Sequence, residues 1–311
     1  MNKLIRQAFT LIELLVVIAI IGILSGMIVV SMNGVTEKAT IAKSQIFSNS
    51  LRNAIMLNLI SDWKFDQVNA SDQTADSWNG GNTATLKENG YVGICDTTHC
   101  PQLKQSDCVS GNCLYFDGIN DYVLHGSNTT LNISGKITIE AWFKTDALSA
   151  TNQVIVQKSA NETHDDPYRL YALLINSNSF PRFSLSTGVA GSQIVLTGNT
   201  TIQANKWYYI AGTWDGTTAN IYLNGAKDNS TGLAFAGPIG TITTNLRSGN
   251  SPINSELFVG YIDNIRLYNE TIPAFQIKEQ YYAGLNSLFT KGNITKKEYQ
   301  NKVTNLTIGE K

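Results

Sequence analysis

A long apolar segment near the N-terminus constrains this 311-residue chain more than any other feature. From Phe9 to Met32 the sequence is almost wholly apolar, interrupted only by a few polar residues and glycines. A run of that length suffices to cross a bilayer as a helix, which takes about 20 apolar residues. Lys3 and Arg6 precede the run, and basic residues favour the cytoplasmic side of a membrane. The pattern predicts a single membrane pass with a cytoplasmic N-terminus and an exported remainder.

Glu13 places a carboxylate inside this apolar segment. An ionisable group in hydrocarbon is costly and therefore indicates a function. A free amine at Phe9, created by cleavage after Ala8, would supply a positively charged partner. A secretory signal peptide would have a shorter apolar run followed by a small-residue cleavage site. A plain membrane anchor would leave Glu13 unexplained.

The sequence that runs from Ala8 to Leu24, AFTLIELLVVIAIIGIL, resembles the leader and stem of type IV pilins and type II secretion pseudopilins. The resemblance implies that residues 1–8 are a leader peptide. It also implies that a prepilin peptidase cuts between Ala8 and Phe9, and that the new N-terminal amine is methylated. In this family the acid at the position of Glu13 pairs with the amine of a neighbouring pilin subunit during assembly. The family usually has glycine where this chain has Ala8.

Residues 9–60 are expected to form one stem helix, with a membrane anchor at about 9–32, because apolar residues recur at near-helical spacing beyond the membrane. Such a helix would be roughly 80 Å long at 1.5 Å per residue. It cannot be buried in its own domain, so it needs neighbours of the kind that a filament core provides. Gly22 and Gly26 form a G-x-x-x-G step that is expected to bring stems close together, although ordinary membrane sequence also contains such steps.

Residues 61–284 have a different character, rich in Gly, Asn, Thr and aromatic residues. Strand-like runs recur there between turn dipeptides such as Asp215-Gly216 and Asn224-Gly225, and no helical pattern interrupts them. This pattern predicts a two-sheet antiparallel sandwich. The clearest predicted strands are 113–116, 122–125, 136–144, 153–158, 168–176, 182–186, 207–214, 220–223 and 257–268.

Several of these segments resemble laminin-G-like, concanavalin A-like jelly rolls. They include DWKFD at 62–66, LYFDGINDYV at 114–123, ITIEAWF at 137–143, WYYIAGTWDG at 207–216 and GYIDNIRLYN at 260–269. The resemblance implies a jelly-roll sandwich of a group whose members often bind glycans or proteins, sometimes with calcium. With the stem helix and a short helical tail at 285–311, the expected fold class is α+β.

The four cysteines, Cys95, Cys100, Cys108 and Cys113, are clustered and even in number. In an exported chain this indicates disulfides, and the spacing C-x4-C-x7-C-x4-C is not a common zinc spacing. Pairing of Cys95 with Cys100 and of Cys108 with Cys113 is favoured because each pair closes a short turn. A nested pairing stays open.

Calcium is the one cofactor that the sequence suggests. Asp117, Asn120 and Asp121 surround a turn, and Asp263 with Asn264 opens the last strand. Such loops offer the oxygen ligands that calcium prefers. The alternative is turn chemistry, because Asp and Asn cap their own backbones. The acidic loop at 161–166 is interpreted as a solvated loop, with binding of a cation or partner as the alternative.

Enzymatic activity is not expected. Glycoside hydrolases take a pair of carboxylates, and the strand at 136–144 offers only Glu140, which is interpreted as structural. The net charge of −1 gives no footprint for nucleic acid. The expected protein is a subunit held in the inner membrane and then displayed on an extracellular pilus, where it binds a glycan or cell-surface protein for adhesion. The alternatives are a pseudopilin of a type II secretion or DNA-uptake machine and, less favoured, a membrane-anchored glycan-active enzyme.

Overall fold

The chain divides into two units, Met1–Leu57 and Asn58–Lys311, and the second has its own hydrophobic core. In the first unit, Leu15, Val16 and residues 18–20 are helical. The rest of the predicted stem up to residue 55 lies outside the described residues. The computed structural model describes residues 15–16, 18–20, 56–78, 81–90, 93–96, 98–229 and 231–308.

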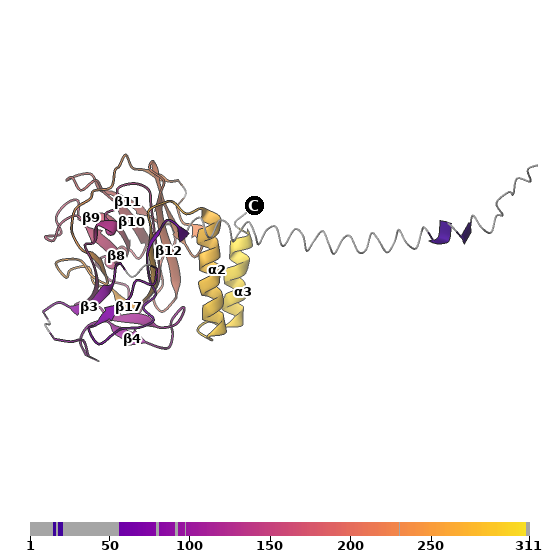
Figure 1. Ribbon diagram of the computed structural model, residues 1–311, viewed down its shortest axis with the longest axis horizontal. Helices are drawn as coiled ribbons and strands as arrows, with labels where there is room; N and C mark the ends of the chain where they lie inside the picture. Colours follow the sequence, from indigo (N-terminus) through magenta and orange to yellow (C-terminus); the bar gives the residue numbers. More distant parts are fainter. Residues whose placement is uncertain are drawn as a thin grey trace, which may run out of the picture. The chain divides into compact units, whose positions relative to one another are not determined.

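The second unit is a sandwich of two antiparallel sheets (Figure 1). In the first sheet the order is β14 (Ala226–Lys227), β13 (Thr218–Leu223), β12 (Tyr208–Trp214), β7 (Ile137–Thr145), β17 (Val259–Tyr268), β5 (Cys113–Asp117) and β4 (Gln102–Lys104), with β1 (Leu59–Trp63) also on β17 and β15 (Leu233–Ala234) on β13. In the second sheet the order is β11 (Ile194–Thr197), β10 (Pro181–Leu185), β9 (Arg169–Ile175), β8 (Gln153–Ser159), β16 (Leu246–Ser248), β6 (Asp121–Gly126), β3 (Ala84–Glu88) and β2 (Gln73–Thr74). The nine clearest strands expected from the sequence are all confirmed.

The core lies between the two sheets, where alternate side chains of each strand meet. In β7 the expected inward set, Ile137, Ile139, Ala141 and Phe143, belongs to this core. Every residue of β7 is nevertheless buried, so the opposite face of the strand is also covered.

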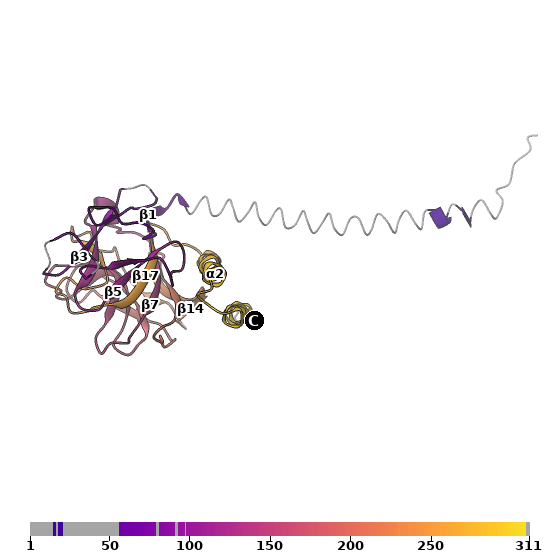
Figure 2. The same ribbon diagram turned by 90° about the horizontal axis from the view of Figure 1, so that it is seen from below.

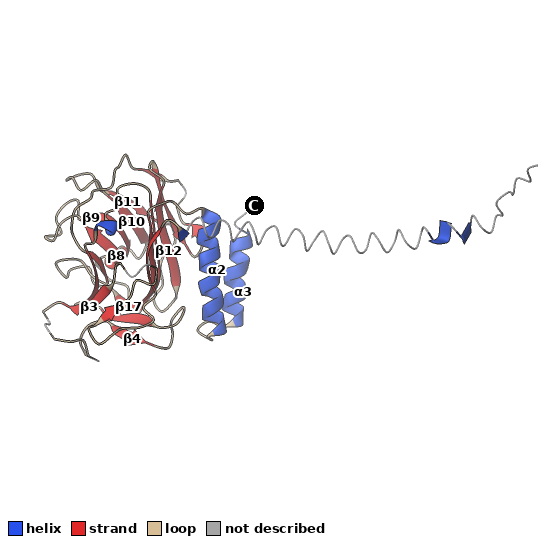
Figure 3. Cartoon of the chain, viewed as in Figure 1, coloured by secondary structure: helices blue, strands red, loops and turns tan. Residues whose placement is uncertain are grey.

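Two helices, α2 (Ala274–Thr290) and α3 (Lys296–Ile308), lie beside each other against the sandwich (Figures 1 and 3). Tyr281 of α2 stacks on Trp142 of β7 with ring centroids 5.5 Å apart. A Cβ at Gly284 would come within 2.4 Å of the Trp142 ring, so only glycine allows this approach. Figure 2 shows α2 end-on near β14 and β7. Helix α2 is therefore the cover that buries the outer face of β7.

Glu140 lies on this covered face and is bound on several sides. Arg266 donates from Nη1 to Glu140 over 3.1 Å and from Nε to Asp62 over 3.0 Å, and Tyr209 donates its hydroxyl to Glu140. Burial alone would lower the pKa of Arg266, but Asp62 and Glu140 outweigh it and raise the pKa. This network supports the structural interpretation of Glu140.

Two boundaries expected from the sequence are wrong. The stem was expected to reach residue 60, but β1 begins at Leu59 because Trp63 fills the core while the backbone pairs with β17. The helical tail was expected from residue 285, but α2 begins at Ala274, since Ile277, Tyr281 and Leu285 continue one buried stripe at helical spacing.

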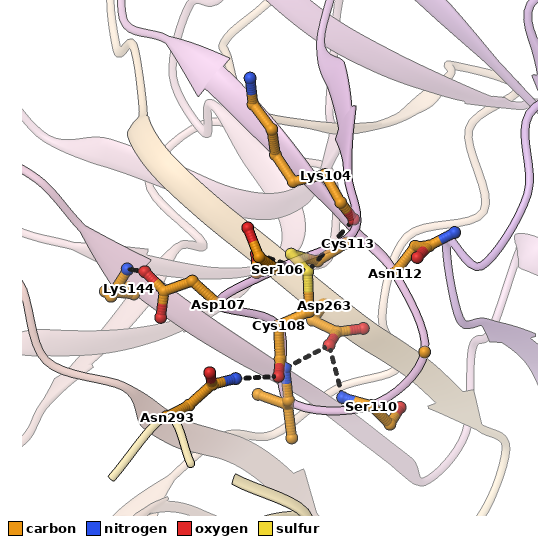
Figure 4. The surroundings of a disulfide bond; sticks show 12 residues. Lys104, Ser106, Asp107, Cys108, Ser110, Asn112, Cys113, Lys144, Asp263 and Asn293 are labelled. Atoms are coloured by element: carbon orange, nitrogen blue, oxygen red, sulfur yellow. Dashed lines mark hydrogen bonds and ion pairs between the residues drawn. A yellow bond between two sulfur atoms is a disulfide. The ribbon is translucent and has the colours of Figure 1, made fainter. Parts of the chain in front are cut away.

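Both disulfides have the favoured local pairing, Cys95–Cys100 and Cys108–Cys113, each with 5.5 Å between Cα atoms. Figure 4 shows the second disulfide and the loop that it closes. Asp263 of β17 lies beneath this loop and accepts hydrogen bonds from the backbone N–H groups of Val109 (3.0 Å) and Ser110 (3.1 Å). Burial raises the pKa of Asp263 although both bonds favour its charged form. Asp263 is thus an anchor for the loop.

Replacing Asp263 with Ala should lower the free energy of unfolding by about 3 kcal/mol, because two buried backbone donors lose their acceptor. The measurement is urea denaturation of residues 58–311 followed by tryptophan fluorescence. Asp117→Asn, at an exposed turn, is the matched control and should cost less than about 1 kcal/mol. A loss that disappears once calcium is chelated would show that Asp263 acts as a metal ligand instead.

His125 of β6 is completely buried in the core. Its ring centroid lies 4.3 Å from that of Trp63, and its Nε2 is 2.8 Å from the hydroxyl of Ser248. Burial lowers the pKa of His125 to about 3. The neutral ring is therefore the form that the folded state accepts.

Acidification should destabilise the domain through His125. Its folded pKa is below the unfolded value of about 6.5, so its contribution is complete above that pH and is lost as the pH falls toward 3. Between pH 6.5 and 4.5 the wild type should lose about 2 kcal/mol more than His125→Gln, measured by urea denaturation at each pH. Parallel pH profiles for the two proteins would contradict the burial of a neutral imidazole.

Candidate ligand-binding site

The residues predicted for processing and assembly, Ala8, Phe9, Glu13, Gly22 and Gly26, lie outside the described residues. Within the described part of the chain, no helix combines the length and apolar character needed to cross a membrane. The structure therefore leaves these predictions as they stood.

The four predicted calcium ligands do not come together. Asp117, Asn120 and Asp121 share the turn between β5 and β6, where Asp121 accepts from the Asp117 N–H (3.0 Å) and Asn120 donates to Glu88 (2.8 Å). Burial, reinforced by Asp117 and Glu88, raises the pKa of Asp121 to about 7. Asp263 instead lies beneath the disulfide loop. The described residues contain no group of three or more His, Cys, Asp or Glu side chains that could hold a metal ion.

A cavity of about 590 Å³ opens on the face of β9–β11 that points away from the core. Phe183 and Leu185 of β10 face the core, so Arg182 between Pro181 and Phe183 projects to the opposite side. Cavities of about 300–1,000 Å³ are typical of small-molecule sites. The cavity is lined by Ala150, Thr151, Asn152, His164, Tyr168, Arg169, Ser177, Arg182, Gln193, Val195, Ser255 and Glu256.

Glu256 is the only carboxylate among these lining residues, and Asn152, Arg169 and His164 surround its two oxygens. Asn152 Nδ2 donates to Oε1 over 2.6 Å, Arg169 pairs with Oε2, and His164 Nε2 is 3.3 Å from Oε2. Burial opposes ionisation of Glu256, but the bond to His164 and the charge of Arg169 outweigh it and lower the pKa to about 2. Glu256 is thus a charged carboxylate that fixes the positions of its partners on one side of the cavity.

Three other polar atoms of the lining are buried without a hydrogen-bond partner: Nε of Arg182, Nδ1 of His164 and Oε1 of Gln193. Buried polar atoms are nearly always paired, so each unpaired one asks for an explanation. All three belong to one cavity, and they include donors and acceptors. Because the three atoms are closed to solvent, a ligand would complete their hydrogen bonds only after the lining side chains shift.

Tyr168 supplies an aromatic surface at the same cavity. Its side chain is 42% exposed, and its ring lies edge-on to His164 with centroids 5.3 Å apart. The backbone of Tyr168 has a positive φ of 54° and is held by hydrogen bonds with Asp165 and Ala160. An exposed ring on a fixed backbone can present an apolar face with little loss of conformational freedom.

A second large cavity, about 660 Å³, lies between α3 and the start of β12. Four of its five charged residues are paired, Lys144 with Asp107 and Lys302 with Glu298, and the fifth, Lys206, donates a hydrogen bond to Gln203. None of its lining atoms is buried without a partner. The cavity at β9–β11 is therefore the better candidate for a ligand.

Sequence reasoning missed this site. The loop at 161–166 is largely exposed, as expected, but the side chain of His164 within it is only 7% exposed and lines the cavity. Arg169 and Arg182 are each the only charged residue of a largely buried strand, and a lone charge in such a strand is the signal that could have drawn attention to them.

Comparison with solved structures establishes the fold of the second unit. The binding domain of Paraclostridial Mosquitocidal Protein 1 matches with a TM-score of 0.54 and 14% identity, over 75% of this chain and 53% of that one. Trypanosoma rangeli sialidase matches with a TM-score of 0.52 and 13% identity, over 72% of this chain and 32% of that one. Domain 4 of a Geobacillus stearothermophilus arabinanase gives a TM-score of 0.49 at 16% identity, over 71% and 97% of the two chains.

Comparison of the sequence with family models gives two matches, whereas no curated protein sequence matches the chain. Residues 5–29 match the prokaryotic N-terminal methylation motif, as the pilin resemblance implied. Residues 117–278, more than half of the chain, match the concanavalin A-like lectin/glucanases model, as the strand sequences implied. The chain therefore belongs to the concanavalin A-like lectin/glucanases superfamily and carries a prokaryotic N-terminal methylation motif at its start.

Proposed function

We propose that this protein is a pilin-like filament subunit whose β-sandwich binds glycans outside the cell, for adhesion. The observation that carries the proposal is the presence of both modules on one chain, a methylation motif at residues 5–29 and a lectin-like domain at 117–278. The motif implies processing by a prepilin peptidase and assembly with pilin-type subunits. It also suggests a subunit that is anchored in the inner membrane before it reaches the surface.

The residues proposed for processing and assembly lie at the start of the chain, in and just before the apolar segment. In this proposal the peptidase cuts between Ala8 and Phe9, and Glu13 pairs with the new amine of a neighbouring subunit. The pair removes the cost of an isolated carboxylate in an apolar filament core. Gly22 and Gly26 let neighbouring stems pack closely.

The cavity at β9–β11 supports glycan binding by the sandwich. Saccharides have apolar faces and many hydroxyl groups, so a site for them needs an aromatic surface beside donors and acceptors. Tyr168 offers the surface, and Arg182, His164 and Gln193 offer polar atoms that no protein group satisfies. A protein ligand on another cell is the alternative partner.

The same cavity supports binding rather than cleavage. Glycoside hydrolysis ordinarily uses two carboxylates about 5–10 Å apart, one of them protonated as the acid. Glu256 is the one carboxylate of the lining, and its lowered pKa suits an anion that stays charged. The proposed domain is therefore a binding module.

A pseudopilin of a secretion or DNA-uptake machine would carry the same N-terminal motif. A cavity with unsatisfied polar atoms favours display of the sandwich to a ligand over a purely mechanical role. The two functions differ in whether the chain is present in filaments sheared from the cell surface.

Replacing Glu13 with Ala should reduce incorporation into sheared surface filaments by about tenfold or more, because the neighbouring amine loses its partner in an apolar core. Immunoblots of sheared and membrane fractions measure the effect. Ser25→Ala changes another polar residue of the same segment and should incorporate normally. Normal incorporation of the Glu13 variant would remove the assembly role.

Replacing Tyr168 with Ala should weaken the glycan hits of an array screen by about tenfold, because a stacking surface is lost. Trp78→Ala is the matched control, since Trp78 is similarly exposed at 39% but does not line the cavity. Equal binding by both variants would place the glycan site elsewhere, and an array without hits would refute glycan binding.

A further inference from the structure

Arg182 differs from every other arginine that the structure describes. Arg169 pairs with Glu256, Arg247 with Glu162, and Arg266 with Asp62 and Glu140. No described residue forms a hydrogen bond or an ion pair with the side chain of Arg182, and its Nε is buried. Arg182 is thus the one described arginine whose charge has no counter-ion.

The surroundings of Arg182 are electrostatically unfavourable for a cation. Burial, followed by repulsion from Arg169, lowers the pKa of Arg182, and Glu256 offsets this only in part. A guanidinium remains charged in proteins, so the unfavourable surroundings of Arg182 lower the stability of the folded protein. Removing such a residue from a site often raises the stability of the protein, because residues that bind ligands are often placed where they destabilise the fold.

The charge of the cavity follows from its lining residues. Arg169 and Arg182 contribute two positive charges and Glu256 one negative charge, so these three residues together have a net charge of +1. The Arg169–Glu256 pair is internally balanced. The excess is therefore located at Arg182.

We propose that the saccharide bound in the cavity at β9–β11 carries a carboxylate, and that Arg182 forms an ion pair with it. This inference rests on the proposed glycan-binding function and narrows it to acidic saccharides. The guanidinium presents parallel donors that match the two oxygens of a carboxylate. Gln193 and His164 then bind hydroxyl groups beside it, and Tyr168 covers an apolar face of the ring. A neutral saccharide would leave the half-buried guanidinium of Arg182 without a counter-ion.

The test is a panel of oligosaccharides in pairs, each uronic acid oligomer beside its methyl ester, which differ only in the charge of the carboxyl group. Binding of the full chain in detergent micelles is measured by isothermal titration calorimetry. The wild type should bind at least one acid form about tenfold or more tightly than its ester. Arg182→Gln should abolish this preference. Lys206→Gln, which removes one positive charge outside the cavity, should keep it.

Each result decides between the inference and its alternatives. Binding of neutral oligosaccharides or esters as tightly as acids, with dependence on Tyr168, would overturn the acidic ligand and leave glycan binding intact. Retention of the acid preference by Arg182→Gln would also overturn the inference. Failure to bind any acid member would do the same.

Thermal unfolding separates a binding role of Arg182 from a structural one. Arg182→Gln should unfold at the same temperature as the wild type or a higher one when no saccharide is present. The acid oligomer should raise the unfolding temperature of the wild type and not that of the variant. A clear loss of stability in the variant, without any change in acid preference, would assign Arg182 to the fold instead.

Discussion

The burial of β7 on both faces determines which surfaces of the sandwich stay open to a ligand. One face of the strand packs into the core between the sheets, and α2 covers the other with Tyr281 against Trp142. Charged groups on that covered face must be paired, and Glu140 and Arg266 are. The first sheet therefore offers little open surface at its centre, whereas β9–β11 of the second sheet keep a cavity open to solvent.

The charge clusters of the two sheets also differ in whether every member has a counter-ion. Beneath α2 the carboxylates and Arg266 satisfy each other, which is what a structural network requires. At the cavity, Glu256 fixes Arg169 and His164, but Arg182 stays without a counter-ion. The paired charges form one side of the cavity, and the charge of Arg182 in the same lining is unpaired. This arrangement is consistent with a ligand-binding site.

Much of the fold could be predicted from the sequence because its signals are local. Alternation in β7 and the turn at Asn224-Gly225 depend on neighbouring residues, and so does the pairing of cysteines five residues apart. The start of α2 was missed, since its buried stripe is recognised only against the sheet that it covers. The cavity was missed for a stronger reason: segments around Asn152, His164 and Glu256 meet only in the folded chain.

The proposed binding of saccharides in the cavity at β9–β11 can be tested directly. The most direct measurement is the side-chain Nε–H resonance of Arg182 in an NMR titration with a carboxylate-bearing oligosaccharide. Saccharide binding at this cavity predicts a saturable shift of this resonance, while that of Arg266, which is ion-paired beneath α2, stays in place. Saturable shifts confined to another surface, such as the turn at Asp117–Asp121, with Arg182 unchanged, would contradict it.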